Sequence, residues 1–238
     1  ALPISNTHFS INEIIHMCFK GALNERTKIT RLYNSIIIED FKTFNLIVRS
    51  TRKEEIMEKN NLLLYEYSLL IHDYKNNKIH KDHYVQSIKS LLKYPILLKK
   101  DILSLVELIM LGELLYFLDS SNQAIIADRI LLSIVYQENL IDTLERNDRI
   151  LNLISRLSNF FGSIGKYSKS ITLCNKGIEL CLKFNEFYLL EYFHYYKALG
   201  CHNLGDINQR NISIADCYFV LLSKKNEAVK SQFINWFK

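Results

Sequence analysis

The chain has 238 residues, 48% of them hydrophobic, and a net charge of +5 from 30 basic and 25 acidic residues. It holds only two prolines and seven glycines, whereas strand-rich folds need frequent turn residues and nucleotide-binding α/β folds need glycine-rich loops. The composition therefore favours an all-α fold, and the modest charge, spread along the chain, argues against nucleic-acid binding by this segment.

Residues 1–50 are expected to form N-terminal helices, followed by a first helix pair. The helices that apolar spacing predicts in this part span residues 9–23, 30–48, 51–74 and 81–92. The pattern loosens at 21–27, which suggests a break there. Thr51 to Glu54 has the form of a capping box, and Pro95 follows the last of these helices. We expect the capping box to open the third helix.

The rest of the chain is expected to complete the repeat region, residues 51–222, and to end in a capping helix, 223–238. The expected helices span 102–118, 123–136, two helices within 151–184 hinged at Gly165, 188–204, 208–222 and 226–238. Residues 137–148 are a polar connection. No linker rich in Pro, Gly or Ser divides the chain, so residues 1–238 are interpreted as one domain.

A repeat of tetratricopeptide type accounts for the spacing of small residues. Within 151–184 the positions that the repeat signature specifies hold Ile154, Leu157, Ser158, Phe161, Ser170, Cys174 and Gly177. The interval from Ser158 to Ser170 recurs from Gly112 to Ala124, and that from Ser158 to Gly165 recurs from Ala198 to Gly205. Small residues allow paired helices to approach closely, and one pair cannot bury its apolar face without neighbours. The sequence therefore predicts a solenoid of tetratricopeptide-like helix pairs.

Five stretches of the repeat region carry a family resemblance: Leu157 to Phe161, Gly165 to Tyr167, Lys176 to Cys181, Tyr195 to Ala198 and Leu204 to Asp206. They resemble the peptide-receptor domains of the Rgg and PlcR type. The wider group also includes Rap, NprR and PrgX, and the resemblance covers residues 100–222. It implies a right-handed superhelix whose concave face binds a short signalling peptide, usually in a homodimer, with an N-terminal helix-turn-helix that binds DNA. The chain begins with Ala1 and shows no helix-turn-helix. DNA binding is therefore expected only through a missing N-terminal domain.

The first helix of each such pair lines the concave face, with inward residues three or four apart. The predicted peptide-binding residues are Asn152, Ser155, Arg156, Asn159, Glu113, Tyr116, Tyr192, Tyr195 and His202. Asn side chains both donate to and accept from a peptide backbone, and Arg can hold a carboxylate with two hydrogen bonds. For the polar row on 152–159 the alternative is a solvated face. For the aromatic residues the alternative is core packing.

No catalytic, cofactor or metal site is expected. The crowded His72, Asp73, His80, Asp82 and His83 fit a surface cluster better than a metal site. The five cysteines, Cys18, Cys174, Cys181, Cys201 and Cys217, have no metal-ligand spacing and indicate buried reduced thiols. No apolar run reaches the roughly 18 residues of a membrane span, and the signal-peptide pattern is missing. We therefore expect a cytoplasmic location.

The leading hypothesis is a peptide-sensing regulatory domain of a transcriptional regulator. Two alternatives remain open: a constitutive scaffold that holds a protein partner, and a Rap-like inhibitor or phosphatase that acts on a response regulator. Enzymatic activity is not expected, because the sequence lacks the common catalytic motifs. These are the phosphate loop, the Gly-x-Ser-x-Gly elbow, His-Glu-x-x-His and Cys-x-x-Cys.

Overall fold

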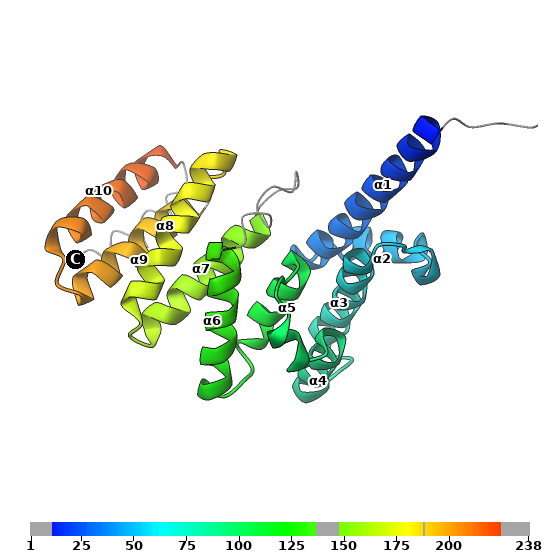
Figure 1. Cartoon of the computed structure of the whole chain (residues 1–238), viewed down its shortest axis with the longest axis horizontal. Helices are drawn as coiled ribbons and strands as arrows, with labels where there is room; N and C mark the ends of the chain where they lie inside the picture. Colours follow the sequence, from blue (N-terminus) through cyan, green and yellow to red (C-terminus); the bar gives the residue numbers. More distant parts are fainter. Residues whose placement is uncertain (1–10, 137–147, 188, 225–238) are drawn as a thin grey trace, which may run out of the picture. The chain divides into compact units, whose positions relative to one another are not determined.

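The structure is a computed structural model of the chain, and it describes residues 11–136, 148–187 and 189–224. Within these residues the regular structure is entirely helical, as expected. The α-helices are α1 (Ile11–Ile37), α2 (Phe41–Arg49), α3 (Lys59–Lys75), α4 (Lys81–Leu92), α5 (Leu105–Leu114), α6 (Ser120–Tyr136), α7 (Asp148–Ser163), α8 (Tyr167–Phe184), α9 (Leu190–Asn203) and α10 (Ile207–Ser223) (Figure 1). Two 3-10 helices are η1 (Lys53–Glu55) and η2 (Ile96–Lys99). Contacts divide the chain into an N-terminal unit, Ala1–Lys99, and a C-terminal unit, Lys100–Lys238.

In the N-terminal unit α1 packs against α2 and α3, and α3 packs against α4. Glu25 of α1 fixes the start of α3: its carboxylate accepts hydrogen bonds from the backbone N–H groups of Met57 and Glu58 and from the Asn61 side chain. Burial opposes ionisation of Glu25, but these hydrogen bonds favour the charged form and lower its pKa. The unit is thus held partly by a charged side chain that bridges two helices.

The prediction of a break at residues 21–27 was wrong. Helix α1 runs through this stretch, and the break lies between α1 and α2. Gly21 costs about 1 kcal/mol relative to Ala in a helix, and the burial of Ile29, Leu32 and Ile36 outweighs that cost. At the true break Asp40 caps α2, because its side chain accepts a hydrogen bond from the Thr43 N–H at 3.0 Å.

The expected capping box at Thr51 was also wrong. The Thr51 hydroxyl donates to the Ile47 carbonyl of α2 at 2.6 Å, so it is committed to the preceding helix. Helix α3 begins at Lys59, where the Glu58 side chain accepts from the Asn61 N–H at 2.7 Å. The following helix, α4, has the predicted bounds.

The C-terminal unit has the contact pattern of tetratricopeptide pairs. Helices α5 and α6, α7 and α8, and α9 and α10 pack in successive pairs, and α8 also packs against α9 (Figure 1). The first helices α5, α7 and α9 contact one another in turn, and so do the second helices α6 and α8. Each pair therefore buries its apolar side against the next, as the repeat architecture requires.

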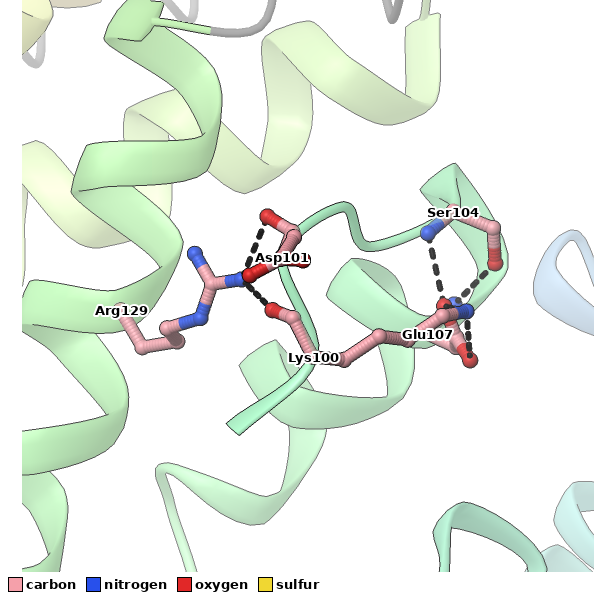
Figure 2. Close-up of polar contacts among 5 residues, drawn as sticks. All are labelled: Lys100, Asp101, Ser104, Glu107 and Arg129. Atoms are coloured by element: carbon pink, nitrogen blue, oxygen red, sulfur yellow. Dashed lines mark hydrogen bonds and ion pairs between the residues drawn. The ribbon is translucent and has the colours of Figure 1, made fainter. Parts of the chain in front are cut away.

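The beginning of α5 is fixed by five polar residues (Figure 2). The Glu107 N–H donates to the Ser104 hydroxyl at 3.3 Å, and the Ser104 N–H donates to the Glu107 carboxylate at 2.7 Å. The Lys100 ammonium pairs with the same carboxylate. Arg129 of α6 donates to the carbonyls of Lys100 and Asp101. The capping box, which the sequence prediction missed, fixes the start of α5, and Arg129 connects the preceding loop to α6.

Small residues stand at close approaches between helices, as the repeat signature predicts. Ser158 of α7 and Ser170 of α8 are both buried, and the Ser170 hydroxyl donates to the Ser158 carbonyl at 2.8 Å. A Cβ added to Gly112 of α5 would lie 2.4 Å from Leu153 Cδ1 of α7. These contacts connect the helices of one pair and the first helices of two pairs.

Both predicted hinges follow the same backbone geometry. Gly165 between α7 and α8 has φ of +72°, and Gly205 between α9 and α10 has φ of +78°, a region that favours glycine.

The expected helices at 151–184, 188–204 and 208–222 are confirmed within a few residues. The polar connection at 137–148 lies outside the described residues except for Asp148, which begins α7. The C-terminal capping helix at 223–238 lies outside them beyond residue 224. The single-domain organisation stays a prediction.

The four cysteines whose side chains are described, Cys174, Cys181, Cys201 and Cys217, are buried and free. Burial raises the pKa of Cys174, Cys181 and Cys217 to about 12. Because the thiolate is the reactive form, these side chains act as small apolar core residues. The expectation of buried reduced thiols is confirmed for these four.

His194 of α9 is expected to make the stability of the α9–α10 contact depend on pH. Its Nδ1 atom is buried and lies 3.5 Å from Asp216 Oδ2 of α10, without hydrogen-bond geometry. Burial lowers the pKa of His194, Asp216 opposes this shift and Lys197 adds to it. Since the unfolded chain, with a His pKa of about 6.5, binds the proton more readily, acidification below that pH should lower the free energy of unfolding.

Urea unfolding at about pH 7.5 and about pH 5.5 measures this loss. His194→Gln should reduce the loss, whereas His202→Gln, at an exposed position of the same helix, should retain it. Equal pH dependence in both variants would show that His194 does not contribute.

Candidate functional site

The first helices of three successive pairs bring charged and aromatic side chains together. Arg156 Nη1 of α7 lies 3.6 Å from Glu113 Oε2 of α5. The Arg156 guanidinium lies over the ring of Tyr116, in the turn directly after α5, 5.7 Å from the ring centroid. Tyr196 of α9 lies close enough to Tyr116 for a charge on one to affect the other. We define the first-helix face by residues Glu113, Tyr116, Arg156, Tyr192, Tyr195 and Tyr196.

Tyr196 links the aromatic residues of this face, and sequence reasoning did not select it. Its ring centroid lies 6.3 Å from that of Tyr192 and 5.7 Å from that of Tyr195. Burial raises the pKa of Tyr196 to about 12, and the neighbouring tyrosines add to the shift. The signal was available, because Tyr196 follows Tyr192 by one helical turn.

The phenols of this face remain neutral at physiological pH. Burial raises the pKa of Tyr116, Tyr192 and Tyr195, as it does that of Tyr196. Each neutral phenol can donate and accept one hydrogen bond beside an apolar ring. Together with the opposite charges of Arg156 and Glu113, the face suits a ligand with apolar side chains and few charges.

The polar row of α7 lies beside Arg156. Asn152 and Asn159 are exposed, Ser155 is partly exposed, and all lie within one turn of Arg156 along the helix. The exposure of the two asparagines leaves their amides accessible, which fits both a binding face and the alternative of a solvated face. Their role in binding stays a prediction.

Three of the predicted site residues have other neighbours. Tyr192 and Tyr195 pack partly against Cys217 and Leu221 of α10, so the core-packing alternative holds for part of each side chain. His202, near the end of α9, is exposed, and its Nδ1 lies 3.4 Å from Arg210 Nη1 of α10. His202 therefore contacts Arg210 of α10 and is not part of the group formed by Arg156 and Tyr116.

One member of the His and Asp cluster in the N-terminal unit, His72, has a packing role, whereas His80, Asp82 and His83 are exposed. The His72 ring stacks on Phe44, with centroids 4.5 Å apart and planes 5° apart, and its Nδ1 lies 3.3 Å from Asp73. Among the described residues, no group of three or more His, Cys, Asp or Glu side chains is arranged to hold a metal ion. Among the same residues, no helix combines the length and the apolarity that crossing a membrane requires.

The helix pairs define a helical-repeat protein of the tetratricopeptide-like class, with a polar and aromatic face on its first helices. The chain resembles the crystal structure of Bacillus thuringiensis PlcR in its apo form, with a TM-score of 0.65 and 14% sequence identity over 97% of this chain and 88% of that chain. At this identity the likeness establishes the fold. It confirms the fold that the sequence resemblance predicted, whereas scans of family models and of curated proteins gave no match.

Proposed function

We propose that this chain is the peptide-sensing part of a transcriptional regulator, and that a short signalling peptide binds the first-helix face. The observation that carries the proposal is the position of Arg156 of α7 between Glu113 of α5 and the ring of Tyr116, with Tyr196 of α9 within electrostatic range of Tyr116. The fold shared with PlcR supports it, together with the sequence resemblance to peptide receptors. Asn152 and Asn159 would bind the peptide backbone, and the tyrosines would contact its apolar side chains.

Peptide binding would regulate an attached DNA-binding domain through the packing between repeats. Because α5, α7 and α9 contact one another in turn, a ligand that touches all three favours one arrangement of the pairs. We propose that the protein acts in the cytoplasm as a homodimer. A scaffold that binds one stable protein partner, or a Rap-like inhibitor of a response regulator, is the alternative to be tested against it.

The test is calorimetric titration with synthetic short peptides encoded beside the gene. Arg156→Gln should weaken the binding of a cognate peptide about tenfold, because a hydrogen bond to a charged group contributes roughly 1.5 kcal/mol. Lys183→Gln on α8, a charge-matched change at an exposed position, should leave the affinity unchanged. Light scattering on the same samples measures whether the protein is a dimer.

Failure of every such peptide to bind or to raise the melting temperature would contradict the proposal. Capture of one stable protein, insensitive to these peptides, would instead favour the scaffold. Loss of phosphate from a response regulator on addition of the chain would favour the Rap-like alternative.

A further inference from the structure

The Arg156 guanidinium is held in place without being fully engaged. Its contact with Glu113 joins one nitrogen to one oxygen at 3.6 Å, longer than the roughly 2.7–2.9 Å of a charge-assisted hydrogen bond. The Arg156 side chain is 57% exposed and that of Glu113 is 27% exposed. The guanidinium lies over the Tyr116 ring, 5.7 Å from the ring centroid. Arg156 is thus charged, accessible and only weakly paired.

An exposed single-contact ion pair of this kind is weak. Such pairs contribute about 0–1 kcal/mol in measured cases. A guanidinium can instead form two parallel hydrogen bonds with one carboxylate. A ligand carboxylate that approaches in the plane of the guanidinium would therefore gain more from Arg156 than Glu113 does, but it must first displace Glu113 or bind beside its negative charge.

Resting on the proposed function, we propose that Glu113 is an internal competitor for Arg156, and that the ligand presents a carboxylate next to an apolar or aromatic side chain. In the free protein Glu113 pairs with the Arg156 guanidinium. In the complex the ligand carboxylate replaces Glu113 as the partner of Arg156. The aromatic requirement follows from the Tyr116 ring, over which the guanidinium lies. Glu113 thereby sets specificity, since uncharged ligands gain nothing from its displacement.

Three small probes distinguish a ligand carboxylate at a chain terminus from one on a side chain. N-acetylphenylalanine carries a C-terminal carboxylate beside an aromatic ring, and N-acetylphenylalaninamide lacks the charge. N-acetyl-Glu-Phe-amide carries the carboxylate on a side chain. Each probe is titrated by NMR into the wild-type chain, Glu113→Gln and Arg156→Gln.

Glu113→Gln should tighten the binding of a carboxylate probe about threefold to fivefold, the factor that corresponds to a weak ion pair. It should leave the amide unchanged. Arg156→Gln should abolish the preference for carboxylate over amide. The stronger of the two carboxylate probes identifies whether a chain terminus or a side chain is recognised.

Glu179→Gln is the matched control, because Glu179 is an exposed acid on α8 that pairs with Lys176. It should not change the preference for carboxylate. An unchanged ratio of carboxylate to amide affinity in Glu113→Gln overturns the inference, as does the absence of carboxylate binding to this variant. If cognate peptides bind the wild-type chain while that ratio is unchanged, only this inference fails; if no peptide binds but the ratio changes, only the proposed function fails.

Discussion

Replacing Lys224 by Met is expected to lower the free energy of unfolding by about 3–5 kcal/mol, because it leaves a buried carboxylate without its counter-ion. The Glu191 side chain of α9 is only 2% exposed, and Lys224, directly after α10, donates to both of its oxygens. The ion pair therefore joins the beginning of α9 to the end of α10. Urea unfolding followed by circular dichroism measures the loss.

The double variant Glu191→Gln/Lys224→Met tests this explanation. A neutral pair removes the uncompensated charge, so most of the lost stability should return. Lys78→Met is the exposed control: Lys78 pairs with Asp73 at the surface, and its loss should cost less than about 1 kcal/mol. A single and a double variant of equal stability would show that the buried charge is not the cause.

Replacing Gly177 by Val is expected to destabilise the fold by about 3 kcal/mol, the upper end of the usual cost of overpacking. A Cβ at Gly177 of α8 would lie 2.5–2.7 Å from three ring atoms of Phe193 in α9. The Phe193 ring is fully buried, so it cannot move aside without displacing its neighbours. Thermal and urea unfolding measure the change.

Gly21→Val provides the matched control within a helix. A Cβ at Gly21 of α1 meets no atom within 4 Å, and Val has a somewhat better helix propensity than Gly. This change should therefore be neutral or slightly stabilising. Phe193→Leu combined with Gly177→Val should recover part of the loss, because it removes ring atoms from the contact. Equal costs at Gly177 and Gly21 would contradict the packing argument.

The candidate site was predicted in part. Arg156, Glu113 and Tyr116 were selected from their positions on the first helices, and the structure brings these three together. Helical periodicity is enough for such a selection, because it determines which residues share a face. Tyr196 was missed and His202 lies with α10, since periodicity does not determine which neighbouring helix a side chain contacts.

The repeat itself was determined by the sequence. The small residues Ser158, Ser170 and Gly112 and the hinges at Gly165 and Gly205 were all visible as letters at regular intervals. Their effect is local and steric: a missing side chain permits a close approach, and a glycine permits a positive φ. The structure confirms each of these roles.

Only the tertiary structure decided where the first helices break, how α5 is capped and which side chains meet on the first-helix face. Local signals favoured a break near Gly21 and a cap at Thr51, but the burial of α1 and the bond from Thr51 to Ile47 favoured another arrangement. The contacts of Arg156 with Glu113 and Tyr116 join α7 to the end of α5 and the turn after it, which are distant in the sequence. Such contacts depend on how whole helices pack, because burial of each apolar face outweighs weak local preferences.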